Sequence, residues 1–106
     1  EPEAIIVDDG SLGQIVITIE AVRVIIMKAI RQVKGIKEVK PVIKNGPEGL
    51  RVSLRVMINP EQSVPEMSQE IQTVVSQHLK DIGGLDVPNI KVIVDDLGTT
   101  GKLAST

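Results

Sequence analysis

The chain contains no Phe, Tyr or Trp among its 106 residues, although 42% of its residues are apolar. Its core must therefore be built from Ile, Val, Leu, Met and Ala, with the β-branched Ile and Val in the majority. Because branched side chains fit best on a pleated, half-buried surface, this composition predicts that a β-sheet forms much of the core. The missing rings also argue against sites that stack bases, sugars or cations on aromatic faces.

Length and residue types limit the class of protein further. A chain of 106 residues suits one domain, in which folding buries about two-thirds of the unfolded surface. The absence of Cys excludes disulfides, thiolate nucleophiles and thiolate metal sites. No apolar run approaches the roughly 20 residues that a membrane-spanning helix needs. The sequence starts at Glu1 without Met, so we expect a fragment of a longer protein, with an upstream membrane segment left open.

The first third of the chain is predicted to form a hairpin followed by a helix. Residues 4–7 and 14–18 are apolar runs separated by a turn-rich segment, which is typical of two strands joined by a short loop. Thr18 stands at the N-cap position of a helix whose apolar residues recur at three- and four-residue spacing. These apolar residues are Val22, Ile25, Ile26, Ala29, Ile30 and Val33. Gly35 suits a left-handed C′ position, so the helix is expected to end near Lys34.

The middle of the chain is predicted to form two longer strands. Residues 36–44 contain Pro41, and because proline donates no hydrogen bond to a neighbouring strand, this strand is expected at a sheet edge or with a bulge. Residues 45–49 have the composition of a turn. Residues 50–58 alternate apolar and polar side chains in the clearest period-two pattern of the sequence, which predicts one buried and one solvent-facing side.

A second amphipathic helix is predicted after residue 63. Ser63 can cap it, Pro65 is tolerated in its first turn, and Glu66 is placed to return the capping hydrogen bond. Its expected apolar stripe consists of Met67, Ile71, Val74, Val75, His78, Leu79 and Ile82. The pair Gly83-Gly84 is expected to end the helix.

The element order predicts an α+β domain. Residues 87–97 form the last expected strand, and the similar segments 35–39 and 84–87 after the two helices hint at two related halves. The order βαββαβ with an extra N-terminal strand is typical of a mainly antiparallel sheet with two helices on one face, in a ferredoxin-like or related split arrangement. We expect residues 1–97 to form this single domain and residues 98–106 to form a flexible tail.

Charge is distributed unevenly along the chain. Residues 1–22 carry five acids and no base, residues 23–55 carry nine bases and two acids, and residues 56–106 carry seven acids and three bases. A basic middle segment favours an acidic partner or anionic lipid headgroups, and a plain solvated face of mixed sign stays the alternative.

The sequence predicts no catalytic, metal or cofactor site. His78 is the single histidine, and its place on an apolar helix face favours a half-buried structural role. The acid pairs Asp8-Asp9 and Asp95-Asp96 lack the spacing of a calcium loop. We therefore expect a protein that is not an enzyme and that works by contact.

The solvent-facing side of the sheet is the expected contact surface, and a plain solvated face with two exposed apolar residues stays the alternative. If the helices cover the apolar side of residues 50–58, the intervening residues and those alternating on the last strand point away from them. These candidate partner-binding residues are Arg51, Ser53, Arg55, Met57, Lys91 and Ile93.

Five short segments follow one another in an order that resembles a known family. They are Gly13-Gln14-Ile15-Val16-Ile17-Thr18 before a helix, residues 33–39 at its end, the alternating strand 50–58, Val64-Pro65-Glu66 at the second helix, and Gly84-Leu85-Asp86-Val87 before a valine-rich strand. Over residues 13–97 the chain resembles the bacterial alkaline shock protein family. It looks most similar to the membrane-anchor branch, in which two transmembrane helices precede a cytoplasmic domain.

The resemblance implies a non-catalytic scaffold in envelope or alkaline stress, at the cytoplasmic face of the bacterial membrane, with this chain itself soluble. The implied partner is a soluble protein of the same family, and self-association is left open. The residues alone leave two alternatives: a ferredoxin-like regulatory module that binds a small ligand, and a weak nucleic-acid binder that uses the basic middle segment.

Overall fold

The computed structural model describes residues 4–96, with every side chain in that range except those of Asp8, Asp9 and Asp96. The predicted tail, 98–106, lies outside the described residues. The elements are β1 (Ala4–Gly10), β2 (Gly13–Thr18), α1 (Ile19–Ile30), β3 (Ile36–Gly46), β4 (Gly49–Ile58), α2 (Val64–Asp81) and β5 (Ile90–Asp96). Within residues 4–96, no helix has both the length and the apolar composition needed to cross a membrane.

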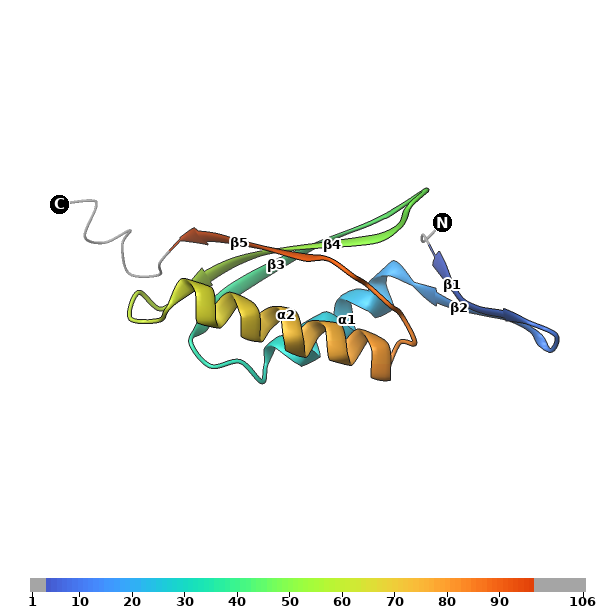
Figure 1. The fold of residues 1–106 in the computed structure, drawn as a ribbon, viewed down its shortest axis with the longest axis horizontal. Coiled ribbons are helices and arrows are strands. Elements are labelled where there is room, and N and C mark those ends of the chain that lie inside the picture. The colour runs from blue at the N-terminus through green and yellow to red at the C-terminus, as the bar shows by residue number, and fades with distance from the viewer. Residues whose placement is uncertain (1–3, 97–106) are drawn as a thin grey trace.

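Strand β4 is the centre of a three-stranded sheet with the order β3-β4-β5. β3 runs antiparallel to β4, and β5 runs parallel to it because α2 carries the chain back between them. Both helices lie on the same face of this sheet (Figure 1). The predicted α+β class, with two helices on one face, is confirmed.

The opening hairpin forms a separate two-stranded sheet. β1 pairs antiparallel with β2, with a register shift between Ile6 and Asp8, and neither strand joins β3, β4 or β5. The sequence predicted that all strands join a single sheet, and the structure instead has two separate sheets. Because β4 and β5 pair directly with each other, no strand from the hairpin separates the two strands that α2 connects.

Local capping signals in the sequence set where both helices begin. Thr18 Oγ1 accepts a hydrogen bond from the Ala21 amide at 3.1 Å, and Ser63 Oγ accepts one from the Glu66 amide at 3.4 Å. Both predicted N-caps are therefore confirmed.

The end of α1 was predicted wrongly. The helix stops at Ile30 rather than near Lys34. The amides of Gln32 and Val33 donate to carbonyls only three residues back, at 3.0 and 2.9 Å, so the chain tightens into turns before Gly35 reaches its positive φ of 93°.

Each of the two helix–strand units contains an equivalent hydrogen bond from the helix to the strand. This equivalence supports the predicted pair of related halves. Arg23 of α1 donates from Nη1 to the Pro41 carbonyl of β3 at 3.2 Å. Gln72 of α2 donates from Nε2 to the Ile90 carbonyl of β5 at 3.0 Å. The donor and the acceptor are 18 residues apart in both cases. Each helix therefore holds the backbone of one edge strand, and Pro41 lies on an edge strand as predicted.

The core lies between the sheet and the helices and is entirely aliphatic apart from Met67. The apolar side of β4 forms its floor, with side chains that are at most 1% exposed: Val52, Leu54, Val56 and Ile58. The helices contribute Ile26, Ile71 and Leu79, among others. Ile82 was predicted to join the stripe of α2 but is 53% exposed, because the helix ends at Asp81 and Ile82 is its C-cap.

Three glycine substitutions separate backbone strain from crowding. Gly49 has a φ of 112° and open space around it, whereas Gly84 combines a φ of 68° with a position where a Cβ would lie 2.9 Å from Val7 Cγ1. Gly49→Ala should lower the free energy of unfolding by about 1–2 kcal/mol. Gly84→Ala should lower the free energy of unfolding by roughly 1–3 kcal/mol more than Gly49→Ala does, because the stiff Val7 side chain must shift.

Gly46→Ala is the matched control, since Gly46 has no positive φ and no atom within 4 Å of an added Cβ. Its effect should stay within about 0.5 kcal/mol in urea unfolding. If Gly46→Ala and Gly84→Ala lowered the free energy of unfolding equally, the close packing of Gly84 against Val7 would be contradicted.

Candidate partner-binding face

The open face is the side of the β3-β4-β5 sheet that points away from α1 and α2 (Figure 1). It consists of the β4 residues that alternate with the buried ones, and of their neighbours across the sheet. Its members are Glu38, Lys40, Val42 and Lys44 of β3, Arg51, Ser53, Arg55 and Met57 of β4, and Lys91, Ile93 and Asp95 of β5.

All six residues predicted as partner-binding candidates lie on the open face. They are Arg51, Ser53, Arg55, Met57, Lys91 and Ile93. Parallel pairing of β4 with β5 places Ser53 opposite Lys91 and Arg55 opposite Ile93. The structure thus brings residues from two separate segments of the chain onto one surface.

Two pairs of like charges face each other across β3 and β4. Lys40 is the cross-strand partner of Arg55, and Lys44 is the partner of Arg51. Like charges directly opposite each other in a sheet destabilise the pairing, by a few tenths of a kcal/mol up to about 1 kcal/mol. Bases in these positions therefore favour the pairing of β3 with β4 less than opposite charges would.

Ion pairs compensate only part of this positive charge. Lys40 Nζ lies 3.7 Å from Glu38 Oε2, and Arg51 Nη2 lies 3.0 Å from Glu48 Oε1. All four side chains are more than half exposed, so each pair contributes at most about 1 kcal/mol. Lys44, Arg55 and Lys91 have no ion-pair partner among the side chains that the structure describes.

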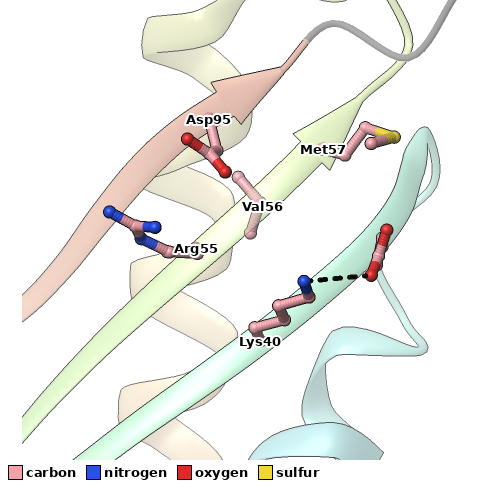
Figure 2. A pocket seen from close by; sticks show the side chains of 6 residues that line it. Lys40, Arg55, Val56, Met57 and Asp95 are labelled. Atoms are coloured by element: carbon pink, nitrogen blue, oxygen red, sulfur yellow. Dashed lines mark ion pairs between the residues drawn. The ribbon is translucent and has the colours of Figure 1, made fainter.

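Two hollows lie at the open face. One, of about 110 Å³, is lined by Lys40, Arg55, Met57 and Asp95 together with Glu38 and Val56 (Figure 2). A volume of this size is below the roughly 300 Å³ of the smallest usual small-molecule sites. The other, of about 500 Å³, is lined by Arg51, Ser53 and Lys91 together with residues of the loop before β5. Its volume falls within the range of small-molecule sites, so the case for a macromolecular partner rests on the charges and the exposed apolar side chains of the face.

Apolar side chains are interspersed among the bases. Val42 is 43% exposed, and Met57 and Ile93 are half-buried. Exposed apolar residues between charges are typical of protein contact surfaces, where the apolar groups lose water and the charges set orientation.

The β3 contribution to the open face was missed at the sequence level. Lys40, Val42 and Lys44 belong to a segment whose alternation Pro41 obscures. The signal that was present is the short turn at Pro47-Glu48, which pairs Gly46 with Gly49 and thereby fixes the pairs behind it as far as Glu38 with Met57, where the register shifts. Counting back from that turn places Lys44 opposite Arg51.

His78 has structural partners at both ring nitrogens. Nδ1 lies 3.0 Å from the Val74 carbonyl, which can only accept, so Nδ1 carries the proton in this network. Nε2 then accepts from Gln32 Nε2 at 3.1 Å. The predicted half-buried structural histidine is confirmed, and its contact with Gln32 joins α2 to the turn after α1.

The acidic side chains do not cluster into a cation site in the part of the chain that the structure describes. No group of three or more His, Cys, Asp or Glu side chains is placed to hold a metal ion there. Asp95 lies beside Arg55 in the smaller hollow (Figure 2), and the predictions concerning Asp8, Asp9 and Asp96 involve side chains outside the described ones.

No family model, curated protein or solved structure matches this chain.

Replacing one base on the open face tests the repulsion across the strands. Lys44→Glu converts the pair with Arg51 into an attraction and should raise the free energy of unfolding by about 0.2–1 kcal/mol at low salt. The gain should shrink at high salt, because screening weakens interactions between exposed charges. Lys34→Glu makes the same charge change in the exposed turn before β3 and serves as the control. If Lys44→Glu lowered the free energy of unfolding and Lys34→Glu did not, repulsion between Lys44 and Arg51 would be contradicted.

Proposed function

We propose that this domain is a non-catalytic protein-interaction domain that binds an acidic protein partner on its open face. The observation that carries the proposal is the placement of like charges opposite each other across β3 and β4, Lys40 opposite Arg55 and Lys44 opposite Arg51. A carboxylate of a partner placed between two such bases turns a repulsion within the sheet into two attractions across an interface.

The physical character of the interaction follows from the exposure of these charges. Exposed bases steer an acidic partner toward the face and raise the association rate, which falls as salt increases. Val42, Met57 and Ile93 supply the apolar contacts that hold the complex once water is displaced. Affinity is expected to be moderate, because the surface lacks the aromatic residues that dominate strong interfaces.

The wider role that we propose is the cytoplasmic scaffold of a membrane anchor in envelope or alkaline stress. Support for it comes from the resemblance of five segments to the alkaline shock protein family, in the order in which they occur. In this role the partner is a soluble protein of that family, and the membrane is reached through a segment upstream of residue 1.

A nucleic acid is the second candidate partner, because the five bases of the open face would also attract phosphates. These bases are Lys40, Lys44, Arg51, Arg55 and Lys91. Binding to a nucleic acid through them would be steeply salt-dependent and independent of sequence. Retention on single- or double-stranded nucleic acid at low salt would support it, and no retention at low salt would remove it.

Charge reversal on the open face tests the leading proposal. The affinity for a soluble alkaline shock family protein is measured by calorimetric titration at low and high salt. Arg51→Glu/Arg55→Glu should weaken binding by about tenfold or more, since two charge contacts are replaced by repulsion.

The control Arg31→Glu/Lys34→Glu makes the same charge change in the exposed turn after α1 and should leave the affinity within about twofold. Equal effects of the two double variants would remove the open face as the binding surface, whereas no binding by the wild-type chain would remove this partner. For the tether, the upstream coding sequence decides: two apolar spans of about 20 residues are expected there, and their absence would end the membrane-anchor role.

A further inference from the structure

The β1–β2 hairpin exposes an unusual share of apolar side chains. Among the described residues, eight large apolar side chains are exposed, and four of them lie on this hairpin. These four are Ile6, Leu12, Ile15 and Val16. Ile6 and Val16 are direct cross-strand partners, at 53% and 48% exposure, and so form one apolar patch on the outer side of the hairpin.

Among the described side chains of the hairpin, those that pack against the rest of the domain lie toward its base. Ile5, Val7 and Ile17 pack against the core, and Val7 approaches Gly84 closely in the loop after α2. Beyond this base the hairpin projects away from the sheet and the helices (Figure 1). A two-stranded hairpin without a third strand or a covering element is marginal in water, so an apolar one is expected to be covered.

The hairpin and the open face carry opposite charges. Residues 4–18 contain Asp8 and Asp9 and no base, and residues 1–22 as a whole contain five acids and no base. The strands of the open face present five bases against two acids, Glu38 and Asp95. The hairpin points away from the three-stranded sheet of its own molecule (Figure 1).

We propose that the β1–β2 hairpin of one copy of this chain docks on the open face of a second copy. The inference rests on the proposed binding role of the open face and names its partner as the acidic, apolar hairpin. Ile6 and Val16 then meet the apolar side chains Val42, Met57 and Ile93, while the acidic end of the hairpin lies among the bases.

The dimensions of the two surfaces are compatible. The seven residues of β1 extend over about 23 Å, and the ten residues of β4 extend over about 33 Å, at about 3.3 Å per residue. Two strands about 5 Å apart fit within the width of three, and facing sheets pack about 10 Å apart. The docked hairpin would therefore lie as a second layer over the open face, opposite the helices.

Two assemblies follow from this contact. Reciprocal docking, with each hairpin on the open face of the other copy, closes a two-fold dimer. One-way docking extends into a chain of copies, because each molecule offers one hairpin and one face. Both assemblies bury the same surfaces. The closed dimer has twice the mass of a monomer, whereas the mass of the open chain grows with concentration.

A charge-swap experiment tests the contact. The mass of the full 106-residue chain is followed by sedimentation over a wide concentration range at low and high salt. The wild-type chain should self-associate, and the variants Asp8→Lys/Asp9→Lys and Arg51→Glu/Arg55→Glu should each do so at least about tenfold more weakly. Mixed in equal amounts, the two variants should associate with each other, because the reversed hairpin of one matches the reversed face of the other.

Two controls keep a failure to fold from mimicking the result. Glu61→Lys/Glu70→Lys makes the same charge change at exposed positions away from both surfaces and should associate like the wild type. Ile6→Ser/Val16→Ser should keep the circular dichroism spectrum of the wild type while its association weakens, because both side chains are already about half exposed.

The outcomes separate this inference from the proposed function. A wild-type chain that stays monomeric at every concentration overturns the inference, as does a folded mixture of the two reversed variants that fails to associate. If Arg51→Glu/Arg55→Glu still abolishes binding to the soluble acidic partner in that case, the proposed function stands alone. Self-association that none of the variants alters would place the contact elsewhere and also overturns the inference.

Discussion

The packing of one side of β4 against both helices is the interaction on which the rest of the structure depends. Val52, Leu54, Val56 and Ile58 have lost almost all contact with water, and α1, α2, β3 and β5 are arranged around them. Without aromatic rings, density in this layer comes from interlocking branched side chains, which have few rotamers. Because side chains of a strand alternate, fixing one side of β4 in the core also fixes which residues form the open face.

Features encoded by neighbouring residues could be read from the sequence, and those that depend on distant partners could not. The caps Thr18 and Ser63 and the period-two pattern of β4 are local, so their positions were predicted. The separation of the hairpin from the main sheet depends on whether β5 pairs with β4 or with another strand, and no local pattern reports that choice. Of the open face, Arg51 and Arg55 were predicted because β4 alternates cleanly, whereas Lys40 and Lys44 required a pairing register that Pro41 obscures.

The open face illustrates a conflict between stability and contact. A sheet optimised for stability alone would alternate opposite charges across its strands, whereas β3 and β4 set Lys40 against Arg55 and Lys44 against Arg51. Natural domains retain such unfavourable contacts mainly where a surface has another task. Arg23 and Gln72 each bind one carbonyl of an edge strand, at Pro41 and Ile90, and so help to hold β3 and β5 against the helices.

The pairing of Ala4 with Thr18 has a mechanical consequence. Thr18 is both the last residue of β2 and the N-cap of α1, so it marks the point at which the hairpin enters the domain. A pulling force on the N-terminal end acts between Ala4 and Thr18 and opens the ladder one hydrogen bond at a time, starting at the base. Since Ile5 and Val7 pack against the core near this base, the load must detach them first, and the unzipped hairpin would then release up to about 50 Å of chain, at about 3.4 Å for each of its residues.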